Sequence, residues 1–195
     1  MNYLAHLYLS QDNSFSKAGN LMADFLKHVD LEVQPQAIRD GIKNHQATDK
    51  FADHHFTIDH LKEAFDPKYR RFVPIAVDVV YDHMLAKSWQ QYHDEELRDF
   101  TARAYQQLAE ARSYMPSVMA ERIDAIAQYD VLASYVSMSS VEKTLKSISR
   151  RMRFKNTLDE TFDELLKQYD LVEESFHVFF PELCAYIEAQ SLETS

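Results

Sequence analysis

The chain has 195 residues, of which 46% are hydrophobic, and a formal net charge of −10. This length fits one domain that can bury a full core, and the negative charge argues against general nucleic-acid binding, which needs cations to displace phosphate counterions. Two glycines and five prolines are few for sheets and turns, so we expect an all-α fold with short connections.

Hydrophobic residues at helical spacing, bounded by capping residues and prolines, predict a succession of helices. In chain order we expect them near residues 2–10, 14–29, 36–64, 74–92, 95–113, 116–128, 139–154 and 158–187. Asn13 is a suitable cap for the second helix, and Pro35 suits the first turn of the third, which could break near Gly41. Pro74 is expected in an N-terminal turn, and Pro181 is expected to kink the last helix.

The sequence predicts neither a membrane span nor a secretion signal. No stretch approaches the ~18 apolar residues of a membrane helix, and the first residues lack the basic and apolar regions of a signal peptide. Cys184 is the only cysteine, which excludes an intrachain disulfide and fits a reducing compartment. We therefore expect a cytoplasmic protein.

Three runs in the first half place carboxylate, imidazole or amide side chains one helical turn apart. They are Asn20–Asp24, His45–Asp49–Asp53 and Asp78–Asp82–His83. Side chains at i and i+4 lie on one helix face, where like charges repel, so stability alone does not explain this spacing. A divalent cation would explain it, because carboxylates, imidazoles and amides bind Mg²⁺, Mn²⁺ or Zn²⁺.

Two of these runs also have a structural alternative. The stripe that contains His45 could be an exposed polar face. Asp78 and Asp82 lie among apolar residues, where an aspartate is costly unless it is paired, hydrogen-bonded or metal-bound. They could instead cap helices or pair with arginines between helices. His6, in an apolar N-terminal segment, is more often a hydrogen-bonded core residue than a metal ligand.

One later segment is strongly basic in this acidic chain. Its cations are Lys143, Lys146, Arg150, Arg151, Arg153 and Lys155, with no acidic residue among them. Such a segment attracts an anionic partner locally, although it could also be a solvated helix face. Other templates fail, since there is no His-Glu-x-x-His motif, glycine-rich phosphate loop or Gly-x-Ser-x-Gly elbow.

Together, these motifs resemble the acyl carrier protein phosphodiesterase family. The matching runs are Met1–Leu7, Gly19–Phe25, Gly41–His54 and Asp78–Ala86, followed by Trp89. The resemblance implies a single-domain helical bundle related to the HD-domain phosphohydrolases. It also implies a Mn²⁺- or Mg²⁺-dependent reaction, in which water releases 4′-phosphopantetheine from the serine of holo-acyl carrier protein.

The resemblance also assigns candidate residues. Those expected to handle metal and water are Asp24, His45, Asp49, Asp78, Asp82 and His83. The catalytic candidates among them are Asp24, His45 and His83. The two histidines are included because an imidazole titrates near neutrality and can move a proton. Because acyl carrier proteins are strongly acidic, the basic segment from Lys143 to Lys155 is the expected docking surface.

Two other functions remain open from the sequence. An HD-like phosphohydrolase acting on a nucleotide or another small phosphate ester would use the same metal site without needing the basic segment. A non-enzymatic helical protein that binds an acidic partner would use the basic segment without needing a metal. The sequence does not predict an oligomeric state.

Overall fold

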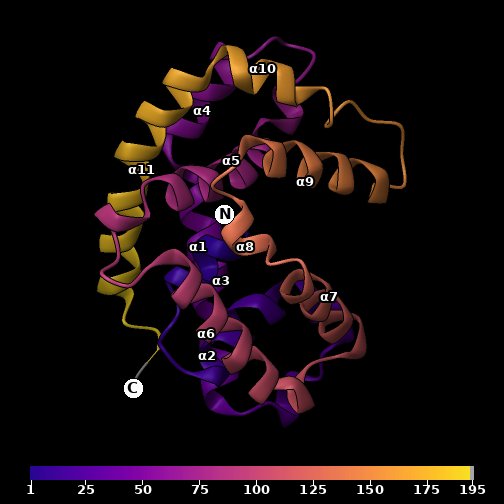
Figure 1. Ribbon diagram of the computed structural model, residues 1–195, viewed down its shortest axis with the longest axis vertical. Coiled ribbons are helices and arrows are strands. Elements are labelled where there is room, and N and C mark those ends of the chain that lie inside the picture. Colours follow the sequence, from indigo (N-terminus) through magenta and orange to yellow (C-terminus); the bar gives the residue numbers. More distant parts are fainter. Residues whose placement is uncertain (194–195) are drawn as a thin grey trace.

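The computed structural model describes residues 1–193, which form helices joined by short loops and contain no strand (Figure 1). The α-helices are α1 (Tyr3–Tyr8), α2 (Ser14–Met22), α3 (Gln36–His54), α4 (Phe56–Ala64), α5 (Val73–Lys87), α6 (Leu97–Glu110), α7 (Ser117–Gln128), α8 (Val131–Ser134), α9 (Met138–Arg151), α10 (Thr161–Lys167) and α11 (Tyr169–Gln190). Short 3₁₀ helices include η1 (Ala23–His28) and η3 (Arg70–Phe72). The predicted all-α fold is confirmed, and no helix within residues 1–193 is long and apolar enough to cross a membrane.

Several predicted boundaries are confirmed. Asn13 caps α2 by accepting a hydrogen bond from the backbone N–H of Ser16. Pro74 lies in the first turn of α5, where its missing N–H leaves no helical hydrogen bond unmade. The predicted helix over 116–128 is α7, and Pro181 lies inside α11.

Three predicted helices have wrong boundaries. The second helix does not run to Val29, because α2 ends at Met22 and Phe25 has non-helical φ and ψ of −117° and 15° within η1. The third helix breaks at His55, whose extended backbone separates α3 from α4, and not at Gly41. The basic helix is capped by Ser137, ahead of the predicted start, and ends at Arg151.

The last predicted helix is two helices. The segment expected over 158–187 divides into α10 and α11, and Gln168 lies between them. The connection is too short to appear in a hydrophobic pattern, because apolar residues such as Leu165 and Val172 are buried on both sides of it. Sequence periodicity therefore found the helical content but missed the junction.

Gly41 allows α2 and α3 to pack at close range. A Cβ atom at Gly41 would lie 2.7 Å from the carbonyl oxygen of Ser16 and 3.1 Å from the Cα of Gly19. A Cβ at Gly19 would in turn collide with the carbonyl of Ile38. The neighbours are backbone atoms that no rotamer change can move aside, so close contact between these two helices requires glycine at both positions.

Gly41→Ala is therefore expected to destabilise the protein, although alanine is the better helix former. Separating α2 from α3 should cost about 1–3 kcal/mol, against a gain in helix propensity of about 1 kcal/mol. A lower midpoint in thermal or urea unfolding would show this. Gln46→Ala, at an exposed position of the same helix, should leave the midpoint nearly unchanged. An unchanged midpoint for Gly41→Ala would contradict the close packing.

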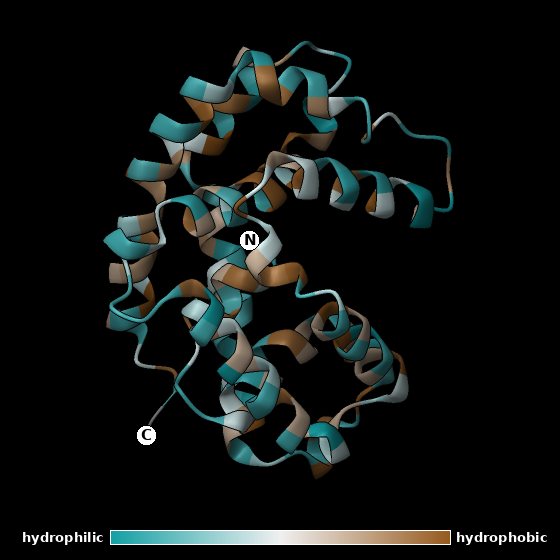
Figure 2. Ribbon diagram, in the orientation of Figure 1, coloured by the Kyte–Doolittle hydropathy of each residue, from teal (hydrophilic) through white to brown (hydrophobic). Residues whose placement is uncertain are grey.

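Helix α5 lies at the centre of the fold, where it contacts α1, α4, α9, α10 and α11 (Figure 1). Most of its side chains are buried, and each of the eleven α-helices formed by residues 1–193 adds to one hydrophobic cluster. Helix α9 packs on α5 through Val141 and Leu145, and hydrophilic residues alternate with hydrophobic ones along the rest of it (Figure 2). This leaves one side of α9 open to solvent.

Candidate active site

Two histidines and one aspartate meet where α1 packs beside α3. His45 and Asp49 lie one turn apart on α3, and the His45 Nε2 is 3.0 Å from Asp49 Oδ2. The His6 ring, from α1, stacks on the His45 ring with centroids 3.8 Å apart, and its Nε2 is 3.4 Å from Asp49 Oδ1. One ligand atom from each of the three lies within 4.8 Å of the others, so the group could hold a metal ion.

The hydrogen bonds of His45 prepare it for a cation. Its Nδ1 lies 2.6 Å from the backbone carbonyl of Asn20, which can only accept, so Nδ1 carries a proton. The Nε2 then faces the Asp49 carboxylate, so a proton or a metal ion must lie between the two atoms. A carbonyl that fixes the tautomer in this way is the usual support of a histidine ligand.

The protonation states of the other two residues fit the same role. Burial, together with the neighbouring His45, lowers the pKa of His6 to about 3, so its imidazole is neutral at pH 7. The buried Nδ1 of His6 has no hydrogen-bond partner within residues 1–193. For Asp49, burial favours the neutral acid, but hydrogen bonds from His45 and His6 outweigh it and lower the pKa, so the carboxylate is ionised. Neutral imidazole and ionised carboxylate are the forms that bind metals.

Asp24 lies at the open edge of this cluster. Its Oδ1 is 3.7 Å from the His45 Nε2, and its side chain remains 48% exposed. Burial, reinforced by Asp49 and opposed by His45, raises the pKa of the Asp24 carboxyl. Because α2 ends at Met22, Asp24 reaches the cluster from η1 rather than from a helix face shared with Asn20.

Asp78 lies beside the cluster but faces an ammonium group. The α-amino group of Met1 is 3.0 Å from Asp78 Oδ1 and 3.6 Å from Asp49 Oδ1. Burial disfavours this charge, but the two carboxylates outweigh it and raise the pKa of the amino group to about 10. Burial also disfavours the charge of Asp78, and for this carboxyl group the effect is a raised pKa. Asp53, one turn beyond Asp49, is exposed and is not one of the three clustered residues.

Asp82 caps a helix. Its two carboxylate oxygens accept hydrogen bonds from the backbone N–H groups of Leu4 and Ala5, at 2.8 and 3.1 Å, in the first turn of α1. Burial, opposed by these two hydrogen bonds, raises the pKa of Asp82 to about 7. The structure therefore matches the capping alternative for this residue, although the sequence favoured a metal ligand.

His83 is not brought to the His45 cluster. Its Nδ1 lies 2.7 Å from the carbonyl oxygen of Tyr135, and its Nε2 lies 3.1 Å from the hydroxyl of Tyr169. Both nitrogens are therefore engaged on another side of α5. Burial lowers the pKa of the ring, which suits a neutral histidine joining α5 to α11 and to Tyr135, the residue after α8.

A cavity of about 800 Å³ opens beside Asp24. Its walls come from the start of the chain, α7, α8 and α9, and Asp24 is its link to the histidine cluster. Tyr3, Arg122 and Arg151 line it, as does Lys143. This volume is within the range of small-molecule sites, so a ligand of substantial size could lie against Asp24.

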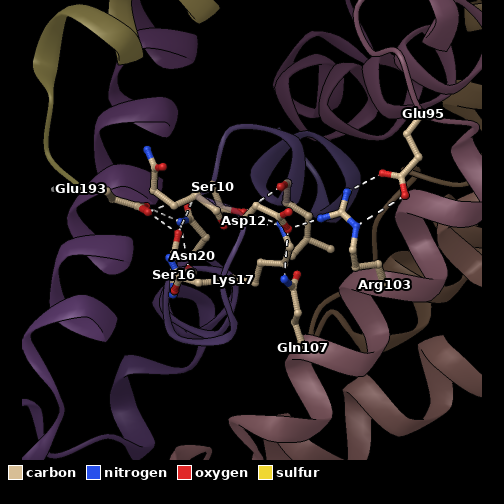
Figure 3. Close-up of polar contacts among 12 residues, drawn as sticks. Ser10, Asp12, Ser16, Lys17, Asn20, Glu95, Arg103, Gln107 and Glu193 are labelled. Carbon is tan, nitrogen blue, oxygen red and sulfur yellow. Dashed lines mark hydrogen bonds and ion pairs between the residues drawn. The ribbon is translucent and has the colours of Figure 1, made fainter. Parts of the chain in front are cut away.

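A polar network holds the end of α2 that carries Asn20. Figure 3 shows Glu193 reaching Asn20 and Ser16, and the Asn20 Nδ2 donates to Glu193 Oε1 at 2.6 Å. On the other side, Asp12 pairs with Arg103 of α6. These contacts fix α2, and with it the Asn20 carbonyl that orients His45.

The structure thus brings together Asp24, His45 and Asp49 of the predicted residues, with Asp78 next to them. It adds His6, which sequence reasoning placed in the core rather than among the ligands. Two features of the sequence could have pointed to His6 as a ligand. It belongs to the Met1–Leu7 run that resembles the family, and it lies in an otherwise apolar segment. Tyr3 and Arg122 were not singled out, because no residue pattern in the sequence connects them with Asp24.

The fold and this cluster define an all-α protein with a candidate His–His–Asp metal site at the edge of a large cavity. The chain belongs to the acyl carrier protein phosphodiesterase family, whose sequence model matches residues 1–183. Relatives named acyl carrier protein phosphodiesterase occur in Enterobacter sp. and Klebsiella pneumoniae. They are 30% and 31% identical over 193 residues, covering 98% of this chain and all of each relative. No solved structure matches this chain.

Proposed function

We propose that this protein hydrolyses the phosphodiester of holo-acyl carrier protein, giving apo-acyl carrier protein and 4′-phosphopantetheine. The observation that carries the proposal is the His6–His45–Asp49 cluster, which adjoins a large cavity through Asp24. The names of the relatives supply the substrate. Such a substrate would place the enzyme in the cytoplasm, in agreement with the single cysteine.

The metal we propose is Mn²⁺, with Mg²⁺ as the alternative, held by His6, His45 and Asp49. Two imidazoles with a carboxylate suit Mn²⁺ better than Mg²⁺, which prefers oxygen ligands. When bound, such an ion neutralises charge on phosphoryl oxygens and acidifies water. The half-exposed Asp24 has room to be a further ligand or to contact the water.

Asp24 is the residue we assign to proton handling, and we assign His45 a positioning role beside it. The Asp24 carboxylate lies at the cavity edge, and its raised pKa makes it a better proton acceptor than an ordinary aspartate. We propose that its Oδ1 accepts the proton of the attacking water. His45, fixed by Asn20, keeps its Nε2 directed toward both Asp24 and Asp49. His83 lies away from these atoms, so we assign it no proton transfer.

Mass spectrometry of holo-acyl carrier protein provides the direct test. With Mn²⁺, the protein should lose the mass of its prosthetic group, and free 4′-phosphopantetheine should appear. With EDTA, the substrate should remain intact, and added Mn²⁺ should restore cleavage. Intact holo-protein after incubation with the metal-loaded enzyme would refute the proposal.

We also propose that the basic segment from Lys143 to Lys155 docks the carrier protein. Arg150 lies at the exposed end of α9, and Arg153 and Lys155 lie in the loop that follows. In this loop the exposed ring of Phe154 stacks against the Arg71 guanidinium, 5.5 Å from the ring centroid. The segment is therefore continuous with the cations of η3, and this basic surface complements an acidic partner.

Charge reversal at Arg150 and Arg153 should raise KM for holo-acyl carrier protein about 10-fold or more at low salt and leave kcat nearly unchanged. The reason is that such cations act mainly on encounter, which salt also screens. Steady-state kinetics at two ionic strengths would show the effect and its loss at high salt. Arg98→Glu, at an exposed position of α6, is the matched control. Unaltered KM in the double variant would instead favour a small phosphate ester as substrate.

A further inference from the structure

Three cations line the cavity beside Asp24 without an acidic partner. They are Arg122 of α7 and Lys143 and Arg151 of α9, and none of them forms an ion pair with a carboxylate in the described part of the chain. Other cations nearby are paired, such as Arg112 with Asp124 and Lys146 with Glu142. Cations gathered at one cavity without counter-charges repel one another and favour an anionic ligand.

Arg122 and Arg151 affect each other directly. Arg122 of α7 and Arg151 of α9 line the same cavity, and burial together with the charge of Arg122 lowers the pKa of Arg151. Arginine presents a fork of N–H donors that matches phosphate oxygens. Two arginines that line one cavity and have no carboxylate partner among residues 1–193 form a suitable site for one phosphoryl group.

Tyr3 connects these arginines with the candidate active site. It lines the same cavity as Asp24, Arg122 and Arg151. Burial raises the pKa of Tyr3 to about 12, with a further increase from Asp24 and an opposing effect from the two arginines. Its hydroxyl therefore keeps its proton and can donate to an anion between Asp24 and the arginines.

The remaining walls suit a chain of mixed polarity. Ile126 and Ile148 supply apolar surface, while Ser147 and Thr144 supply hydroxyl groups. A bare phosphate ion would leave most of the 800 Å³ unused. A phosphorylated chain with amide groups would use both kinds of wall.

We propose that Arg122 and Arg151 form the phosphate subsite for the 4′-phosphopantetheine arm, which lies along the cavity between α7 and α9. This inference rests on the proposed function, since that function supplies the arm. It gives α9 two roles. Arg151 and Lys143 line the cavity, whereas Arg150 and Arg153 do not and remain available to the carrier protein.

Product binding measured by calorimetry in EDTA tests the subsite without any turnover or metal. The wild-type protein should bind 4′-phosphopantetheine at least about 10-fold more tightly than pantetheine, which lacks the phosphate. The double variant Arg122→Gln/Arg151→Gln should lose about 10- to 100-fold in affinity for 4′-phosphopantetheine, because hydrogen bonds between charged groups are lost. Its affinity for pantetheine should stay the same. Arg150→Gln, the neighbouring position, and Arg98→Gln should keep wild-type affinity for both ligands.

Several results would overturn the subsite. One is a preference for 4′-phosphopantetheine over pantetheine that persists in the double variant. Another is a loss of affinity for 4′-phosphopantetheine in the Arg150→Gln control that equals the loss in the double variant. Inorganic phosphate binding as tightly as 4′-phosphopantetheine would refute the assignment of the cavity to the arm. If holo-acyl carrier protein is cleaved but the free product shows no preference over pantetheine, the subsite fails and the proposed function stands. If holo-acyl carrier protein is not cleaved at all, the proposed function fails.

Discussion

Asp49→Asn is expected to remove metal binding and activity together while leaving the fold intact. Among residues 1–193, Asp49 is the one carboxylate that contacts both His6 and His45, and its side chain is 45% exposed. Losing even an outer partner of a metal ligand costs about 10- to 100-fold in affinity, so losing a ligand should cost at least about 100-fold. Titration with Mn²⁺ and a holo-acyl carrier protein cleavage assay would measure the two losses.

Asp53→Asn is the matched control for this variant. Asp53 lies one helical turn further along α3 and is exposed outside the cluster, so the same chemical change should leave both metal affinity and activity near wild type. Equal losses in the two variants would indicate a general effect of charge on α3. Retained metal affinity in Asp49→Asn would contradict the assignment of Asp49 as a ligand.

The sequence predicted the helical content well because periodicity records which helix faces are buried. It predicted the junctions poorly, since His55 and Gln168 interrupt helices without any glycine or proline. At such places tertiary contacts decide where a helix ends. The His55 Nε2, for example, lies 3.0 Å from the Oε2 of Glu182 on α11.

The candidate site was predicted where a single helix defines it and missed where several segments meet. His45 and Asp49 are one turn apart on α3, so their spacing already placed them together. His6 joins them only because α1 packs beside α3, and no periodicity reports that contact. Asp78 and Asp82 show the reverse case, since the same i, i+4 spacing directs one carboxylate to an ammonium and the other to backbone N–H groups.

Asp82→Ala is expected to be among the most destabilising single changes in this protein. It would remove both acceptors of the Leu4 and Ala5 N–H groups, and both residues are completely buried. Losing a helix cap costs about 1 kcal/mol, and each buried unsatisfied donor adds about 1–3 kcal/mol. We therefore expect a total loss of about 3–7 kcal/mol, which calorimetry or urea unfolding would show as a lower midpoint.

Asp82→Asn separates the cap from a metal role. Asparagine keeps one oxygen acceptor for α1, so it should lose roughly half as much stability as alanine. Because α1 carries His6, loosening its first turn should also weaken metal binding in proportion to the loss of structure. A variant with full stability and greatly weakened metal affinity would instead make Asp82 a ligand, as the sequence pattern suggested. If the variant loses stability, and loses metal affinity only in proportion to that loss, the Asp82 carboxylate acts by holding α1 and His6 in place.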